Sequence, residues 1–143
     1  MSNTVSKTYH IQSPAAKVWE ALITPEIIKK YFFDTNVSGK WEKGSIITFS
    51  GEYQGKQYED KGIILDIVPE KLLTINFWSS MTGKPNIPEN YSPYSYKLSD
   101  HNGHTDVTIE QQGSFETAES KEKAFQHWDI VMDGLKKLLE GTA

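Results

Sequence analysis

Residues 120–141 have the spacing of one long amphipathic helix, and this helix constrains the fold more than any other segment. Its apolar side chains recur at intervals of three and four, at Phe125, Trp128, Met132, Leu135 and Leu139. Lysines and glutamates lie off this stripe, so we expect one buried face. Because alternating, aromatic-rich segments precede the helix, we expect a curved sheet that wraps around it. Such an arrangement encloses a concave apolar chamber, which is a usual place for a small ligand.

Length and composition favour one globular domain over residues 1–143. The formal charge of −4 comes from 15 basic and 19 acidic residues that are interleaved along the chain, so we expect no nucleic-acid partner. The chain contains no cysteine, which excludes disulfides and thiolate chemistry and fits the cytoplasm. The N-terminus lacks a secretion signal, and no apolar run is long enough for membrane insertion.

The N-terminal third predicts one strand followed by two short helices. Val5, Tyr9 and Ile11 alternate with polar residues, as in a strand. Ser13 then offers a capping hydroxyl in front of a proline suited to the first helical turn. The Thr-Pro pair at 24–25 ends the first helix and begins the second.

From residue 33 onward, single glycines separate segments that favour strands. These segments are 46–53, 58–68, 72–78, 94–98 and 105–111, with tight turns expected at 54–56 and 100–103. The proline-containing stretch 80–93 is expected to form a loop at the mouth of the sheet. The predicted order is therefore β-αα-β(several)-α, an α+β fold with an antiparallel sheet.

Strand alternation identifies the side chains that should line the chamber, because residues two apart share a face. The candidate ligand-binding residues are Phe49, Tyr53, Tyr58, Ile75, Phe77, Tyr94, Tyr96, Trp128, Met132 and Leu135. The alternative is that these residues form only a packed core. The tyrosines favour a ligand, because a buried phenol needs a hydrogen-bond partner.

The sequence offers few candidates for catalysis, and we assign no catalytic residue, metal ligand or cofactor. Asp100, His101, His104 and Asp106 lie around a predicted turn, where solvated side chains are expected, and they lack the helical spacing of a zinc protease. His127 could act as an acid or base, with Asp129 or Glu110 orienting it.

Four stretches together resemble the SRPBCC superfamily, which includes START and Bet v 1-like domains. They are the run SPAAKVWEAL with the following Thr-Pro-Glu, the run WEKGS at 41–45, residues 62–77, and the helical stripe from Trp128 to Leu139. Within the superfamily they resemble the branch of activator of Hsp90 ATPase homologue 1-like (AHSA1) proteins. The resemblance covers nearly the whole chain and implies a helix-grip fold, in which an antiparallel sheet bends around the C-terminal helix.

The resemblance leaves three functions open. The leading prediction is a non-enzymatic module that binds a small hydrophobic or aromatic molecule, including lipids, beneath the C-terminal helix. The first alternative is a protein-interaction role like that of the Hsp90 co-chaperone, although this chain lacks that protein's separate N-terminal domain. The second alternative is an enzyme like the polyketide cyclases and aromatases, with Tyr94, Tyr96 and His127 moving protons.

Overall fold

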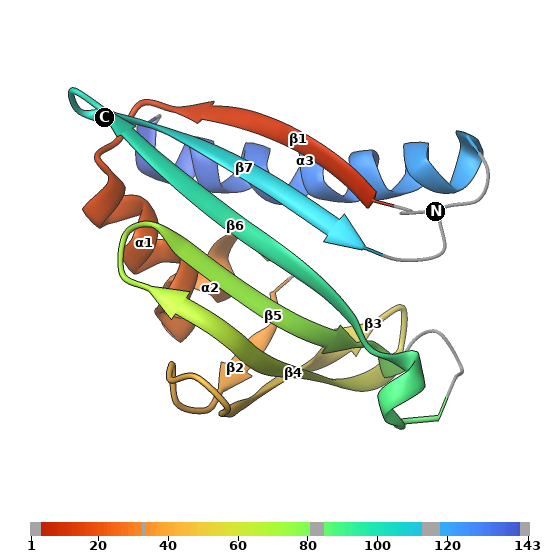
Figure 1. Ribbon diagram of the computed structural model, residues 1–143. Helices are drawn as coiled ribbons and strands as arrows, with labels where there is room; N and C mark the ends of the chain where they lie inside the picture. The colour runs from red at the N-terminus through yellow and green to blue at the C-terminus, as the bar shows by residue number, and fades with distance from the viewer. Residues whose placement is uncertain (1–3, 33, 81–84, 113–117, 141–143) are drawn as a thin grey trace.

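The computed structural model describes residues 4–32, 34–80, 85–112 and 118–140 (Figure 1). The elements are β1 (Thr4–Ile11), α1 (Ala15–Ile23), α2 (Pro25–Tyr31), β2 (Asn36–Ser38), β3 (Ile46–Tyr53), β4 (Lys56–Val68), β5 (Leu72–Trp78), a 3-10 turn (Pro88–Asn90), β6 (Ser92–His101), β7 (His104–Gln112) and α3 (Ala118–Glu140). All strands belong to one antiparallel sheet in the order β1-β7-β6-β5-β4-β3-β2. The predicted α+β helix-grip fold is confirmed.

Two tight turns set the register of the β3–β4 and β6–β7 hairpins. The first has Gln54 and Gly55 at φ angles of 50° and 82°, and the second has Asn102 and Gly103 at 54° and 96°. Two successive positive φ angles define a type I′ turn, whose twist matches that of the flanking strands. Each turn therefore places the side chains of its two strands in fixed alternation, with one set facing α3.

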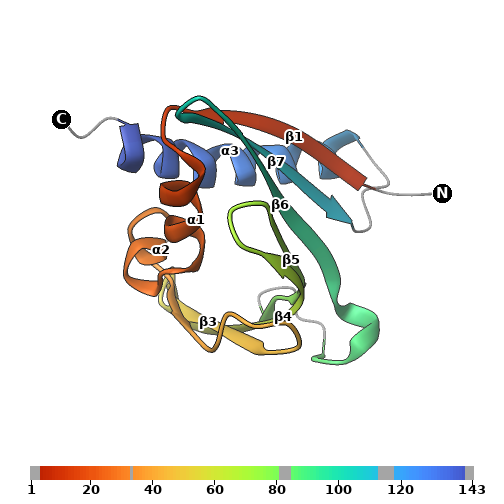
Figure 2. The same cartoon turned by 60° about the vertical axis from the view of Figure 1, so that its left-hand side comes forward.

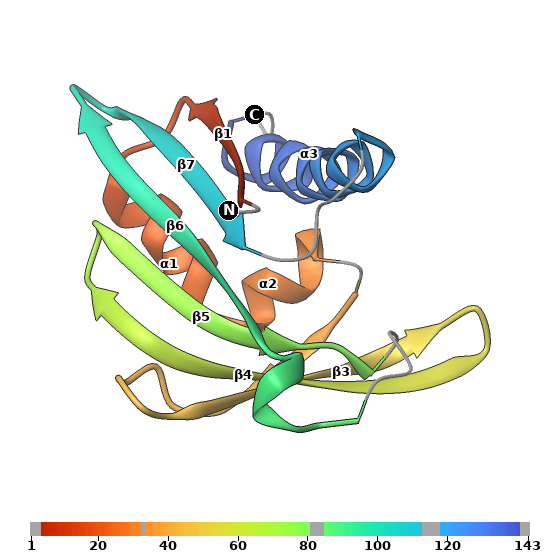
Figure 3. The same ribbon diagram turned by 45° about the vertical axis from the view of Figure 1, so that its right-hand side comes forward.

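The three helices lie on the same side of the curved sheet, as the views in Figures 2 and 3 show. Helix α3 runs beside the edge strand β1, and α1 and α2 lie between α3 and the opposite edge, where α2 packs on β2. The short helices thus close one end of the space between the sheet and α3.

Helix α3 packs through the stripe predicted from its sequence. Trp128, Met132 and Leu135 are buried, and Val131 joins them. Gly134 allows the close approach of α2, since a Cβ added there would lie 3.3 Å from the Tyr31 Cβ. The missing side chain lets the backbone of α3 approach Tyr31, which is itself buried.

The start of α1 differs from the expectation for Ser13. Pro14 is the residue that flanks the helix, with no side-chain cap of its own, and Ser13 is buried while its carbonyl accepts a hydrogen bond from Thr105 Oγ1 at 2.7 Å. The cap comes from a distant residue, because the backbone N–H of Ala15 donates to Asp100 Oδ2 at 3.1 Å. The carboxylate of Asp100 thereby joins the β6–β7 turn to the helix.

Candidate ligand-binding site

Five aromatic side chains form a continuous row on the face of the sheet that α3 covers. We call them the aromatic row: Phe49 on β3, Phe77 on β5, Tyr94 and Tyr96 on β6, and Trp128 on α3. Successive ring centroids lie 5.5 Å apart for Phe49 and Phe77, 5.9 Å for Phe77 and Tyr94, and 5.2 Å for Tyr94 and Trp128. The rings meet at steep angles, as favoured by their edge and face charges.

One end of the aromatic row is a three-ring cluster. Tyr96 lies 5.7 Å from Tyr94 and 5.8 Å from Trp128, in both cases with ring planes nearly perpendicular. The indole Nε1 of Trp128 donates a hydrogen bond of 2.8 Å to Gln111 Oε1 on β7. Gln111 is not among the residues predicted from the sequence, although its spacing of two from Ile109 places it on the same inward face.

Gly62 on β4 makes room for the opposite end of the row. A Cβ added at this position would lie 2.6 Å from Ile75 Cγ2 and 3.1 Å from Phe49 Cε2. Phe49 and Ile75 therefore occupy the space that a larger residue at position 62 would fill. A glycine inside a strand often marks such a close approach.

The phenol groups of Tyr94 and Tyr96 have an unusual environment. Their side chains are buried, with only 6% and 5% of the residue exposed. Among the described residues, neither hydroxyl has a hydrogen-bond partner, yet every fully enclosed side-chain oxygen or nitrogen in this part of the chain has one. It follows that neither phenol oxygen is fully enclosed, so water or a ligand can contact each of them.

A third phenol, that of Tyr31, already has a hydrogen-bond partner in the protein. The Tyr31 hydroxyl on α2 donates a hydrogen bond of 2.7 Å to the carbonyl of Ala21. Burial raises the pKa of Tyr31, Tyr94 and Tyr96. The charge of a neighbouring phenolate would raise the pKa of Tyr31 and of Tyr96 further. All three phenols are therefore neutral at physiological pH.

The remaining candidate residues fall into three groups. Ile75, Met132 and Leu135 are buried in the core beside the aromatic row. Tyr58 lies against Gly51, its cross-strand partner, and its hydroxyl is 2.6 Å from Thr35 Oγ1. The side chain of Tyr53 lies outside the described part of the structure.

At the mouth of the sheet, a buried carboxylate holds the end of β5. Asp60 Oδ1 accepts hydrogen bonds from the backbone N–H of Ser80 at 2.7 Å, from the Ser80 hydroxyl at 2.9 Å and from the Ser79 hydroxyl at 3.3 Å. Asp60 is the cross-strand partner of Phe49, so this carboxylate lies next to the first ring of the aromatic row.

A separate groove lies at the edge of the sheet, between β1 and α3. Its volume is about 460 Å³, and it is open to solvent. Its lining residues are Tyr9, His10, Ile11, Asp129, Ile130, Met132, Asp133 and Lys136. The groove was not expected from the sequence, because it depends on where α3 lies beside the edge strand.

The carboxylates considered as partners of His127 have other partners. Asp129 Oδ1 accepts from Lys7 and Tyr9, at 2.7 Å in both cases, and Glu110 Oε1 is 2.9 Å from Lys97 Nζ. The His127 ring instead packs against Phe32 and Trp128, with centroids 6.1 and 5.4 Å away. Loss of water around the ring lowers the pKa of His127.

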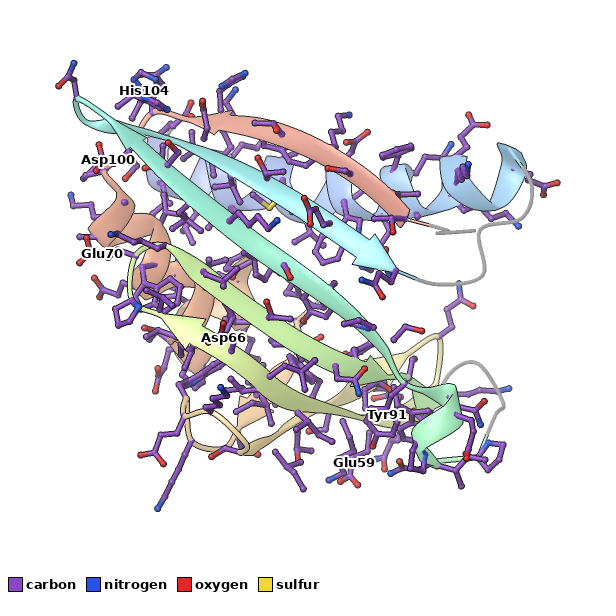
Figure 4. The ribbon with its side chains drawn as sticks, in the orientation of Figure 1. Glu59, Asp66, Glu70, Tyr91, Asp100 and His104 are labelled. Atoms are coloured by element: carbon purple, nitrogen blue, oxygen red, sulfur yellow. The ribbon has the colours of Figure 1, made fainter. Side chains whose placement is uncertain are left out.

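One histidine of β1 and one of the β6–β7 hairpin contact the Asp106 carboxylate, near the end of the sheet that carries the labelled Asp100 and His104 in Figure 4. Asp106 Oδ1 is 2.5 Å from His10 Nδ1, and its other oxygen is 3.5 Å from His101 Nε2. In the described ranges, no three His, Cys, Asp or Glu side chains are arranged to hold a metal ion. Within the same ranges, no helix has both the length and the apolar character needed to cross a membrane.

The family model described as "Activator of Hsp90 ATPase homolog 1-like protein" matches residues 12–140. Among solved structures, ChR145 from Cytophaga hutchinsonii is 39% identical with a TM-score of 0.84, over 96% of this chain and 94% of that one. CalU16 from Micromonospora echinospora is 22% identical with a TM-score of 0.73, over 98% and 76%. Aha1 from Colwellia psychrerythraea, described as a dimer, is 20% identical with a TM-score of 0.75, over 96% of each chain. The last two similarities show the fold alone, and no curated protein matches the chain.

Proposed function

Because the chain belongs to the family of activator of Hsp90 ATPase homologue 1-like proteins, we propose that it binds a small hydrophobic or aromatic molecule between the sheet and α3. The aromatic row carries this proposal. A ligand with a flat apolar body would pack against the ring faces and edges of Phe77, Tyr94 and Trp128. The absence of cysteine suits a reducing compartment, so we place this activity in the cytoplasm.

The phenols of the aromatic row support the proposal of a binding site. The acid or base considered from the sequence was His127, and the two carboxylates expected to orient it are bonded to Lys7, Tyr9 and Lys97 instead. The phenols of Tyr94 and Tyr96 suit recognition, because they stay neutral and can donate hydrogen bonds.

A titration against a panel of fatty acids, sterols, flavonoids and polyketide-like aromatics tests the proposal. Thermal unfolding and backbone amide NMR shifts are followed together. A ligand that binds only the native state raises the melting temperature, and the shifts should centre on Phe77, Tyr96 and Trp128. Shifts confined to Tyr9 and Ile130 would place the ligand in the groove between β1 and α3 and overturn the assignment of the site.

A protein partner is the second candidate function. The family description names an activator of another protein, and Ile130 is 59% exposed beside the groove between β1 and α3. An exposed apolar side chain beside a groove adds apolar area that a protein partner can cover. If no compound in the panel changes the melting temperature or the amide shifts, this function becomes the leading one.

A further inference from the structure

The two unpartnered phenols define what a ligand of the aromatic row must offer. Tyr94 and Tyr96 are neighbours on one face of β6, and both contact Trp128. Each hydroxyl is a donor without a protein acceptor among the described residues, and neither oxygen is fully enclosed, because every fully enclosed polar side-chain atom there has a partner. A ligand that removes water from these hydroxyls has to replace the lost hydrogen bonds, or the phenols remain unsatisfied at a cost to affinity.

The charges around the row restrict the acceptor further. Among the described residues, the buried polar or charged side chains are those of Ser13, Thr35, Asp60 and Thr105, so none of them is a cation. The one carboxylate in this set, Asp60, is the cross-strand partner of Phe49. An anionic ligand would lose its hydration without gaining a positive partner among these buried side chains.

We propose that the ligand of this site is an uncharged molecule whose carbonyl or comparable acceptor receives hydrogen bonds from Tyr94 and Tyr96, and that the site discriminates against carboxylates of the same shape. The inference rests on the proposed function and adds the chemical class of the ligand. Burial raises the pKa of Tyr94 and Tyr96, so both phenols keep their protons and can donate hydrogen bonds to such an acceptor.

Three probes with the same aromatic body separate the effects of shape, acceptor and charge. Acetylnaphthalene carries a carbonyl, ethylnaphthalene has nearly the same size without an acceptor, and naphthoate carries a carboxylate. We expect acetylnaphthalene to bind about tenfold more tightly than ethylnaphthalene, as one or two neutral hydrogen bonds would give. Naphthoate should bind more weakly than either at neutral pH, with affinities measured by NMR titration.

Variants that lack one of the two hydroxyls show which tyrosine is responsible for the preference for a carbonyl. Tyr94→Phe and Tyr96→Phe should each reduce the affinity for acetylnaphthalene severalfold and leave that for ethylnaphthalene unchanged. Tyr91→Phe is the matched control, because the Tyr91 hydroxyl donates to Asn86 Oδ1 at 2.6 Å outside the row. It should change neither affinity.

The unliganded variants provide a second measurement. Since neither hydroxyl bonds to a described residue, Tyr94→Phe and Tyr96→Phe should keep or raise the melting temperature. A clear loss of stability would mean that the hydroxyls serve the fold, and it would overturn the inference.

The binding outcomes separate this inference from the proposed function. Equal affinity for all three probes, or tighter binding of naphthoate, would leave the ligand site in place and refute its acceptor preference. If Tyr94→Phe and Tyr96→Phe both keep the wild-type preference for acetylnaphthalene over ethylnaphthalene, the acceptor preference is likewise refuted and the ligand site stays in place. Absence of binding by the probes and by the wider panel would refute the ligand site itself and the inference with it.

Discussion

The Tyr9 hydroxyl donates a hydrogen bond of 2.7 Å to Asp129 Oδ1, and this bond ties the outermost strand of the sheet to α3. Lys7 Nζ contacts the same carboxylate oxygen at 2.7 Å. Further along, the backbone N–H of Gln12 donates to Glu140 Oε2 at 2.7 Å. Helix α3 is thus fastened to the edge of the sheet at two places, which fixes its position over the aromatic row.

Tyr9→Phe should therefore destabilise the protein by about 1 kcal/mol or less, as expected for one partly exposed hydrogen bond. The remaining ring keeps its contacts with the groove, so the loss belongs to the hydroxyl alone. Urea unfolding measures the change. Thr8→Val on the same strand is a useful comparison, because Thr8 Oγ1 bonds within the sheet to Thr108 and does not reach α3. Amide shifts along α3 in the first variant only would show that the bond positions the helix.

Trp128→Ala should destabilise the fold by about 3 to 5 kcal/mol, as for other buried aromatic truncations. The indole is 4% exposed, touches Tyr94 and Tyr96, and is bonded to Gln111. Lys136→Ala, on the exposed face of the same helix, should have little effect and controls for helix propensity. Unchanged thermal unfolding of the tryptophan variant would contradict a helix gripped by the sheet.

Asp100 should make stability depend on pH in the acid range. Backbone hydrogen bonds from Ala15 and Gly103 lower the pKa of its carboxyl in the folded protein. A lowered folded-state pKa means that the stabilising contribution is complete above the ordinary pKa of about 4 and is lost as the pH falls through the folded value. The stability gap between the wild type and Asp100→Asn should therefore be larger at neutral pH than in acid.

Urea unfolding at both pH values checks this expectation for Asp100. Glu42→Gln, at an exposed loop position, shows the effect of removing one surface charge. A gap that stays constant with pH, or widens in acid, would contradict the capping role.

The elements that were predicted correctly are those whose signals are local. The strand at 72–78 was placed with the bounds of β5, and the two type I′ turns fall within the predicted stretches. The inward side of Tyr94 and Tyr96 followed from alternation alone, and both are buried. A period of two residues and a positive φ angle are properties of the chain segment itself.

The features that were missed depend on contacts between distant residues. The cap of α1 comes from Asp100, which is 85 positions from Ala15, while the local candidate Ser13 is buried and serves another bond. The strand β2 has only three residues, too few for alternation to be recognised. The groove beside β1 exists because α3 lies next to the edge strand, and no local pattern encodes that placement.

Gly62→Ala should cost about 1 to 3 kcal/mol, because the new Cβ would lie 2.6 Å from Ile75 Cγ2 in a packed core. Without that contact, the same change in a strand would stabilise by about 0.5 to 1 kcal/mol, so the sign of the effect reports the packing. Leucine lacks the Cγ2 methyl, and Ile75→Leu alone should cost less than about 1.5 kcal/mol. The double variant should then be more stable than the sum of the single changes predicts, which a double-mutant cycle by urea unfolding measures. Additive losses, or a stabilised Gly62→Ala protein, would show that β4 does not approach Ile75 closely and that the row has room there.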